Sequence, residues 1–405
     1  MPALTIGDPA PWFITPSIAK FPSSQDITIG GYRAVLFFFG SARDRRIQTV
    51  LEAFLAAQAE FEQQKIPVFG VSINPADQAL EQRIKAPHLR FLWDFEGELS
   101  IRYGVCQLGD RPQGGITYDP TTFVLDENLR VLEVIPLETH IAHVEQVLTC
   151  LKQLPAPQPA RLIQKVAPAL FVPHVFPAEF CQELIAHYEA NGGTTSGFMK
   201  QESDQAVVVV DPTIKRRRDW MITDATLLNQ INHYIGQRVL PEIEKAFQSR
   251  ITYFERYLVA CYEDSTQGFF KAHRDNGNMG TAHRRFAMTL NLNDGYEGGY
   301  LRFPEYGDDL YSPEPGGAVI FSCSLLHEVV PVTQGRRFAL LSFFYNDADA
   351  KLREQTRQHI VRKDGSEAEF HAGNQPIRLP RGGAKQPSPS AKASRKSPTG
   401  FQPKK

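Results

Sequence analysis

The chain has 405 residues, more than one hydrophobic core usually organises, so we expect two domains. Its apolar content of 42% and charged content of 22% are ordinary for a globular protein, and a net charge of −1 excludes a global field that favours nucleic acid or membranes. We find no run of about eighteen apolar residues and expect no secretory signal. The five cysteines lack zinc or CxxC spacing, which predicts reduced, mostly buried thiols in a cytoplasmic protein.

The N-terminal part alternates apolar strands with amphipathic helices. Residues 34–39 (AVLFFF) form a continuous apolar run, which is typical of a strand buried on both faces. Between residues 43 and 64 the apolar positions recur at steps of three and four, which predicts one face of a helix. The order predicts a mixed sheet covered by helices. The expected strands are 34–39, 68–73, 91–93, 121–125 and 131–135, and the expected helices are 43–64, 76–85 and 141–154.

Several N-terminal segments carry a family resemblance. They are IGDPAPWF, VLFFFG, FGVSINP, LWDFEGELSIRYGV and TTFVLDENLRVLEV. In this order and spacing they resemble the peroxiredoxin-type thioredoxin fold. The resemblance implies an α/β thioredoxin-like domain over residues 1–153.

The residues that peroxiredoxin chemistry needs are absent from the matching positions. Such enzymes use a thiolate in a P-x-x-x-T-x-x-C loop, with an arginine that lowers its pKa. Here Gly40 replaces the proline, Asp44 the threonine and Ile47 the cysteine, and Pro120 stands where the arginine would lie. We therefore expect no peroxidase activity and a docking or scaffolding role, in which this domain binds a partner.

Composition marks two boundaries after this domain. Residues 154–162 (LPAPQPARL) hold three prolines, which predict a stiff linker to a second domain at 163–350. Residues 351–405 form a polar extension, and from His371 onward they contain eight Lys or Arg and no Asp or Glu, which predicts a disordered basic tail. The tail solubilises the protein or contacts nucleic acid. Apart from it, we expect neither nucleic acid nor a membrane as a partner.

The second domain opens with helices and continues with short strands. Phe180, Leu184 and Tyr188 recur every four residues, and a longer helical stretch covers 224–247 with Asp224 as its expected N-cap. From residue 251 onward, short apolar segments alternate with turn residues. The predicted fold class is an α/β thioredoxin-like fold followed by a double-stranded β-helix (jelly roll) with flanking helices.

An H-x-D pattern, His273 and Asp275, ends one predicted strand, and His327 lies on another strand 54 residues after His273. Fe(II) oxygenases bind their metal with two imidazoles and one carboxylate on one face, and leave the other positions open for co-substrate and oxygen. The H-x-D pair supplies two ligands from one turn, and the third comes from a strand beside it in space. The sequence therefore predicts iron ligation by these three residues.

A basic residue for the co-substrate lies on the next predicted strand. Arg337 follows His327 by ten residues. Its planar, permanently charged guanidinium suits the far carboxylate of 2-oxoglutarate. Arg336 and Arg337 point to opposite faces of a strand, so only one of them faces the site.

The flanking segments carry a second resemblance. LVACYEDSTQGFFKAHRDN, DGYEGGYLRFPE and PGGAVIFSCSLLHEVVPVTQGRRFAL are similar to the prolyl 4-hydroxylase branch of the Fe(II)- and 2-oxoglutarate-dependent dioxygenases, over about residues 165–346. This resemblance implies catalytic roles for His273, Asp275, His327 and Arg337, with Tyr262 beside the co-substrate. It implies Fe(II), 2-oxoglutarate and O2 as cofactors, and it leaves ascorbate open as a further one.

The chain departs from that family at two positions near the expected site. Asn291 stands where the oxygen-sensing enzymes have a second tyrosine, and Phe343 where they often have a tryptophan. Substrate affinity and specificity are therefore the properties that the resemblance leaves open.

Other residues near the motifs have two interpretations. Residues 215–218 (KRRR) predict either a basic substrate loop or a solvated charged face. His283, Arg284 and Arg285 precede a strand and are either structural or at the border of the site. Cys323 is expected to be a core thiol rather than a ligand.

The expected function is hydroxylation of a substrate, coupled to decarboxylation of 2-oxoglutarate to succinate. The resemblance favours a prolyl residue in a protein or peptide. Two alternatives stay open. One is a free amino acid or small metabolite as substrate, and the other is a thioredoxin-fold adaptor fused to an oxygen or 2-oxoglutarate sensor.

Overall fold

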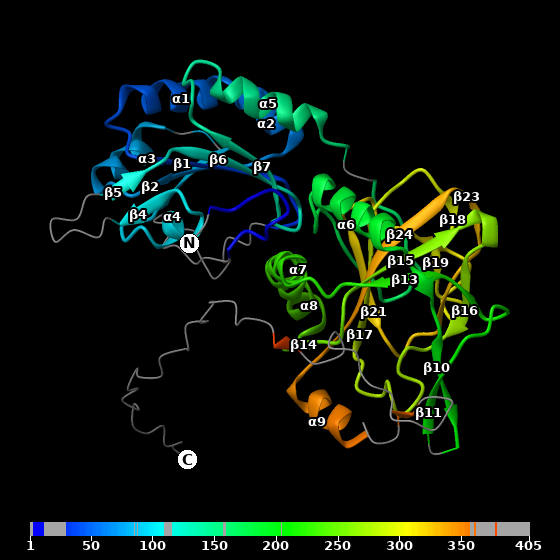
Figure 1. Ribbon diagram of the computed structural model, residues 1–405. Helices are drawn as coiled ribbons and strands as arrows, with labels where there is room; N and C mark the ends of the chain where they lie inside the picture. Colours follow the sequence, from blue (N-terminus) through cyan, green and yellow to red (C-terminus); the bar gives the residue numbers. More distant parts are fainter. Residues whose placement is uncertain are drawn as a thin grey trace, which may run out of the picture.

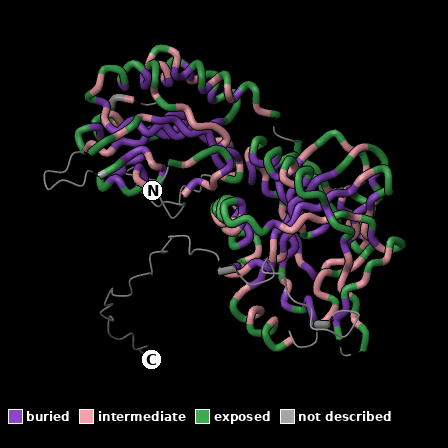
Figure 2. The backbone as a smooth tube through the Cα atoms, in the orientation of Figure 1, coloured by how far each residue is buried: buried purple, intermediate pink, exposed green. Residues whose placement is uncertain are grey.

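The computed structural model describes residues 3–11, 30–84, 86, 88–108, 116–156, 159–203, 205–356, 360–361 and 377–378. The elements form an N-terminal unit around one sheet and a C-terminal unit around two packed sheets (Figure 1). Buried residues fill the interior of each unit separately (Figure 2). Among the described residues, no helix is long and apolar enough to span a membrane.

The N-terminal unit is a five-stranded mixed sheet in the order β3-β2-β1-β6-β7. β1 pairs in parallel with β2 and antiparallel with β6, and β6 and β7 form a hairpin. The elements are β1 (Ala34–Gly40), α1 (Arg45–Ala56), α2 (Gln58–Gln64), β2 (Val68–Ser72), the 3₁₀ helix η1 (Pro75–Ala79), α3 (Leu80–Arg83), β3 (Leu89–Trp93), α4 (Glu98–Arg102), β4 (Cys106–Leu108), β5 (Ile116–Tyr118), β6 (Thr121–Leu125), β7 (Val131–Pro136) and α5 (His143–Gln153).

Every residue of β1 is buried, as its continuous apolar sequence predicts. Val35, Phe37 and Phe39 pack with residues of α1, α2 and α5 on one face of the sheet. Leu36 and Phe38 pack with α4 on the other face. Helices thus cover both faces, and the predicted thioredoxin-like fold is confirmed.

Two helices expected in this unit are divided. The stretch 43–64 forms α1 and α2, because the backbone of Ala57 leaves helical geometry (φ −86°, ψ 18°). The stretch 76–85 forms η1 and the single turn of α3. Apolar periodicity predicts which face of a helix is buried, and it does not predict where the hydrogen-bond ladder breaks.

The C-terminal unit is the predicted jelly roll. Its larger sheet has the order β8-β21-β17-β24-β15-β13-β9, and its smaller sheet has the order β12-β16-β22-β19-β20. The inner faces pack together, because Leu341 of β24 shares a core cluster with Phe270 of β16. The strands are β8 (Leu170–Val172), β9 (Thr194–Thr195), β10 (Phe198–Glu202), β11 (Gln205–Val209), β12 (Lys215–Arg216), β13 (Arg218–Met221), β14 (Tyr253–Phe254), β15 (Leu258–Glu263), β16 (Phe269–His273), β17 (Phe286–Asn291), β18 (Glu297–Gly298), β19 (Leu301–Arg302), β20 (Leu310–Tyr311), β21 (Ala318–Ser322), β22 (His327–Val329), β23 (Val332–Gln334), β24 (Arg336–Tyr345), β25 (Ile360–Val361) and β26 (Ile377–Arg378).

Helices cover the outer face of the larger sheet. α6 (Ala178–Asn191), α7 (Ala225–Arg238) and α8 (Leu240–Phe247) pack in one cluster with Leu340 and Phe344 of β24. These β24 residues alternate with inward-facing ones such as Leu341.

The long helix expected at 224–247 is two helices. The Asp224 carboxylate accepts hydrogen bonds from two N–H groups of the first turn of α7, which confirms the predicted N-cap. The helix divides at Val239, because Pro241 has no N–H to donate and its ring clashes with a helical carbonyl. At the other end of the unit, α9 (Asp347–Thr356) crosses the boundary expected at residue 350. Most of the predicted basic tail lies outside the described residues.

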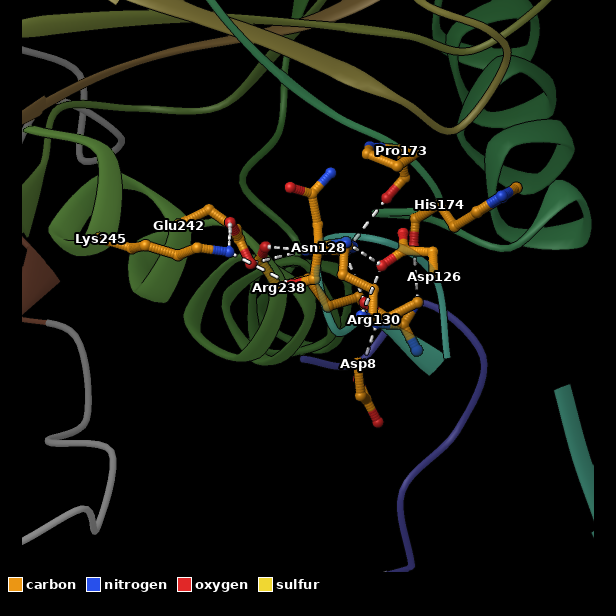
Figure 3. A network of polar contacts seen from close by, with 10 residues as sticks. Asp8, Asp126, Asn128, Arg130, Pro173, His174, Arg238, Glu242 and Lys245 are labelled. Carbon is orange, nitrogen blue, oxygen red and sulfur yellow. Dashed lines mark hydrogen bonds and ion pairs between the residues drawn. The ribbon is translucent and has the colours of Figure 1, made fainter. Parts of the chain in front are cut away.

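A network of buried charged residues joins the two units (Figure 3). Arg130, just before β7, donates to the carbonyls of Pro173 and Arg238, both at 3.1 Å, and lies 3.5 Å from Glu242 of α8. Arg238, at the end of α7, donates in turn to the Asp8 carboxylate at 2.8 Å. Each unit therefore inserts one buried arginine into polar groups of the other.

Candidate metal centre

Three side chains from the smaller sheet converge on one point. His273 ends β16, Asp275 follows it by two residues, and His327 begins β22, opposite His273 in the antiparallel ladder. One possible ligand atom from each lies within 4.8 Å of the others. The Asp275 carboxylate oxygens are 3.5 Å from Nε2 of His273 and 3.2 Å from Nε2 of His327. The fold therefore brings the three predicted ligands together.

Backbone carbonyls orient both imidazoles. Nδ1–H of His273 donates to the Lys271 carbonyl at 2.7 Å, and Nδ1–H of His327 donates to the Leu325 carbonyl at 3.0 Å. Because a carbonyl only accepts, each Nδ1 carries a proton, and in the neutral ring each Nε2 keeps its lone pair. Both Nε2 atoms face the Asp275 carboxylate. This donor set fits a divalent transition metal such as Fe(II).

Burial and mutual contact shift the pKa of all three groups. Burial lowers the pKa of His273. Burial also opposes protonation of His327, but the nearby carboxylate raises its pKa above the ordinary value. Burial alone would raise the pKa of Asp275, yet the two imidazoles hold it well below its usual range. The carboxylate is therefore ionised at neutral pH, as a metal ligand must be.

Arg337 lies on the inner face of β24, directly opposite Tyr262 of β15. Only 3% of it is exposed, and its guanidinium lies 5.7 Å from the tyrosine ring centre. Nε and Nη2 donate to Oδ1 of Asn291 at 3.1 and 2.9 Å, and Nη2 also donates to Thr289 at 3.0 Å. No described residue accepts a hydrogen bond from Nη1. Its N–H groups are therefore available to a ligand carboxylate.

Asn291, the first departure from the family pattern, holds this guanidinium in place. Its own amide donates to the Pro313 carbonyl at 2.7 Å, which fixes Oδ1 toward Arg337. Sequence reasoning missed this role, although alternation along β17 places residues 289 and 291 on one face. The neighbouring Arg336 points outward and pairs with Glu189 at 2.6 Å, so only one arginine of the pair faces inward.

The basic run 215–218 lies on β12 and β13, where Arg216 and Arg218 are exposed and Lys215 and Arg217 are not. Lys215 is buried in β12, where its ammonium donates to the Gly197 carbonyl at 2.7 Å. Arg217 pairs with Asp219 at 2.6 Å and donates to the Tyr262 hydroxyl at 3.2 Å. Both expectations were wrong for these two residues, because pairing of β12 with β16 and of β13 with β15 buries alternate members of the run.

The three basic residues just before β17, His283, Arg284 and Arg285, point to different surroundings. His283 is buried 3.3 Å from Glu255 and has a structural position. Arg284 pairs with the same glutamate at 2.8 Å and reaches the backbone carbonyl of Asp275 at 3.5 Å, so it borders the centre. Arg285 points away from the centre and pairs with a carboxylate of α9.

The thiols and the peroxiredoxin positions are structural. All five cysteines are free and four are buried; burial raises the pKa of Cys323, which is a core thiol as expected. In the N-terminal unit, Asp44 caps α1 by accepting from an N–H at 2.8 Å. Ile47 is 2% exposed and packs in the core beneath the sheet. No nucleophile stands at that position.

Comparison with known families agrees with this division of the chain. Residues 257–345, which contain all of the residues predicted as ligands, match the model of the 2OG-Fe(II) oxygenase superfamily. Residues 6–134 match the model of the AhpC/TSA family. One segment of the chain is thus similar to the AhpC/TSA family, and another is similar to the 2OG-Fe(II) oxygenase superfamily. Both family resemblances predicted from the sequence are thereby confirmed.

The oxygenase segment also has individual relatives. A PKHD-type hydroxylase from Synechococcus sp. (strain JA-3-3Ab) is 30% identical over 93 residues, which are 21% of this chain and 41% of that protein. The chain therefore spans about two fifths of the length of this relative. A Pseudomonas putida prolyl-4-hydroxylase structure covers 44% of this chain and 94% of its own, with 23% identity and a TM-score of 0.36. For the AhpC/TSA segment, a Xanthomonas campestris peroxiredoxin Q structure covers 30% of this chain and 79% of its own, with 18% identity and a TM-score of 0.28.

Proposed function

We propose that this protein is an Fe(II)- and 2-oxoglutarate-dependent dioxygenase that hydroxylates its substrate. One observation carries the proposal: His273, Asp275 and His327 converge within 4.8 Å, and their free donor atoms face one another. Arg337 on the inner face of the opposite sheet adds a partner for a dicarboxylate. The family match over residues 257–345 supports the same assignment.

Each inner-face residue has a defined role in this proposal. His273, Asp275 and His327 hold iron, which together with 2-oxoglutarate supplies the oxidising chemistry and the decarboxylation to succinate. Arg337 binds the far carboxylate of 2-oxoglutarate through Nη1. Tyr262, buried beside that guanidinium, keeps water from the ion pair and so strengthens it.

We infer a prolyl residue in a protein or peptide as the substrate. The inference rests on the resemblance of the motif segments to the prolyl 4-hydroxylase branch, and a PKHD-type hydroxylase among the relatives supports a hydroxylation. A free amino acid or small metabolite is the alternative. A cytoplasmic location belongs to the same proposal, and the assay below, run with and without ascorbate, decides whether this reductant is needed.

The test is iron-dependent formation of succinate from 2-oxoglutarate by the full-length protein. The Asp275→Ala variant is expected to lose this activity, and Asp309→Ala, which removes an exposed carboxylate outside the centre, is expected to keep it. Proteins captured from a lysate by Asp275→Ala are then treated with active enzyme and searched by mass spectrometry for single-oxygen additions. Fully metallated protein that forms no succinate contradicts the proposal.

We further propose that residues 1–153 serve as a docking or scaffolding domain, joined by residues 154–162 to an oxygenase domain at 163–350 and a basic extension at 351–405. Ile47 at the nucleophile position argues against peroxide reduction. The buried contact of Arg130 with α8 argues that the first domain is fixed to the second rather than tethered. A full-length protein that loses its captured partners when surface residues of the first domain are changed supports an adaptor role.

A further inference from the structure

Two arginines lie together beside the metal centre. The Arg284 guanidinium stacks 3.8 Å above the ring of Phe343, and that of Arg256 lies 5.8 Å from the same ring. Phe343 lies on the inner face of β24, the same face as Arg337. Arg284 also reaches the backbone carbonyl of Asp275 at 3.5 Å. We call Arg256 and Arg284 the arginine pair; it adjoins the predicted ligands on the inner face.

One carboxylate serves both members of the pair. Glu255 lies 2.8 Å from Arg256 and 2.8 Å from Arg284. Burial alone would raise the pKa of Glu255, but the two guanidinium groups hold it well below its usual range. His283, which also faces this glutamate, has its pKa lowered by burial and adds no charge at neutral pH. The arginine pair therefore keeps one positive charge in excess.

A second basic side chain without an acidic partner lies nearby. Arg217 is neutralised by Asp219 at 2.6 Å, but Lys215 pairs with no carboxylate among the described residues. Burial first, and then the charge of Arg217, lowers the pKa of Lys215, and the charges of Arg256 and Asp275 act on it as well. This lysine, the arginine pair and the metal centre thus share one electrostatic environment.

The loaded centre does not neutralise this excess. A divalent metal, Asp275, Arg337 and dianionic 2-oxoglutarate balance one another. Arg256 is the accessible member of the pair, with 22% of its side chain exposed against 9% for Arg284. Of the Arg256 nitrogens, only Nη1 donates a hydrogen bond to a described residue. The remaining N–H groups of Arg256 are therefore available to an anion that reaches the inner face.

We propose that the hydroxylated substrate carries a carboxylate close to the oxidised carbon, and that Arg256, held by Glu255 beside Phe343, binds it. This inference rests on the proposed function and names its substrate class. A planar guanidinium fixed against an aromatic ring suits a carboxylate better than a mobile lysine does. The carboxylate is that of an acidic residue in a peptide, or the main-chain carboxylate of a free amino acid or a C-terminal residue.

Two matched pairs of probes test the proposal by calorimetry on full-length protein loaded with Mn(II) and 2-oxoglutarate without oxygen. L-proline against L-prolinamide tests a main-chain carboxylate. Acetyl-Gly-Pro-Asp-amide against acetyl-Gly-Pro-Asn-amide tests a side-chain carboxylate. In at least one pair, the carboxylate member is expected to bind about tenfold more tightly or better, the scale of a charge-assisted hydrogen bond.

Variants separate binding by the pair from a merely structural role. Arg256→Gln is expected to remove the preference for the carboxylate member and to leave the neutral member unchanged. Arg256→Lys keeps the positive charge but not the planar pair of N–H donors, and it is expected to show part of the wild-type preference for the carboxylate member. Arg285→Gln is the matched control, because this adjacent arginine pairs with Asp349 away from the centre.

Equal binding of both members in each pair, or binding of none of the four probes, overturns the proposal. An Arg256→Gln variant that weakens only 2-oxoglutarate binding also overturns it. Binding of 2-oxoglutarate to the Mn(II)-loaded protein is measured first. If 2-oxoglutarate binds and the probes show no preference, this inference fails alone; if 2-oxoglutarate does not bind, the proposed function fails.

Discussion

Each unit of the chain has a strand that ends where the sequence resemblance implies reactive side chains, and the two strand ends differ. β1 of the N-terminal unit leads into α1, where Ile47 packs in the core. β16 of the C-terminal unit ends at His273, and Asp275 and His327 complete a donor set. Both sheets are intact. A buried core therefore maintains a fold whether or not the few side chains that perform chemistry are present.

The largest expected effect concerns the unit that has kept its polar site. Arg337→Gln leaves Asn291 and Thr289 without their charged partner and removes the proposed carboxylate partner. We expect the affinity for 2-oxoglutarate to fall roughly a thousandfold. Calorimetry on the Mn(II)-loaded protein measures it. Arg336→Gln, one residue away on the opposite face, is the control and is expected to bind normally; equal loss in both variants would mean that position 337 has no special role.

The contact between the units predicts the next effect. Arg238→Ala leaves the partly buried Asp8 carboxylate without its charged partner and is expected to lower the free energy of unfolding by about 3 kcal/mol. Lys245→Ala, at the exposed rim of the same network, is expected to change it by less than about 1 kcal/mol. Chemical denaturation of both variants measures the difference. If the two units of Arg238→Ala unfold in separate transitions at the same denaturant concentrations as in the wild type, the network does not couple them.

A pH effect is expected in the N-terminal unit. Burial lowers the pKa of His143 to about 4, and this ring lies 2.7 Å from the Thr122 hydroxyl. The folded-state pKa is depressed, so below about pH 6.5 the unfolded chain binds a proton that the folded chain does not. The contribution of His143 to the free energy of unfolding is therefore fully present above pH 6.5. It falls by up to about 3 kcal/mol as the pH drops toward 4.

The neutral variant His143→Asn isolates this term. Its free energy of unfolding, measured across pH 4–7, is expected to change less steeply with pH than that of the wild type. The absolute stability also changes with the core substitution, so the slope is the quantity to compare. Parallel slopes in the two proteins would show that another group causes the pH dependence.

The smallest expected effect is none. Ile47→Cys restores a sulfur at the nucleophile position, but the side chain is buried and no arginine stands at position 120 to lower its pKa. We expect peroxide consumption with a thiol reductant to remain at the wild-type rate. A rise of about tenfold or more would show that the N-terminal unit lost only its cysteine and not the rest of the site.

Local patterns predicted a large part of this fold. The run 34–39 predicted β1, and the N-cap at Asp224 was correct, because both depend on neighbouring residues. The strand pair β4–β5 and the short helix α4 were not predicted, because these elements are too short to show a periodic pattern of apolar residues. The division at Val239 was missed although Pro241 signals it.

For the candidate site too, the sequence predicted some features and not others. Spacing within motifs predicted that His273, Asp275 and His327 converge, and the resemblance to the prolyl 4-hydroxylase branch implied that Arg337 is the arginine that faces inward. It did not predict that Asn291 holds this arginine or that Lys215 is buried, because both follow from pairing between distant strands. The contact between Arg130 and Glu242 joins residues of different units and has no local signal at all.

The central claim is that His273, Asp275 and His327 form one metal site, and direct metal binding tests it. Full-length protein is titrated without oxygen with Mn(II), a stable substitute for Fe(II), and the stoichiometry is measured by calorimetry. We expect one ion per chain, a loss of binding in Asp275→Ala and normal binding in Asp309→Ala. A chain that binds no ion, or that binds it equally well after Asp275→Ala, would show that these three residues do not form a metal site.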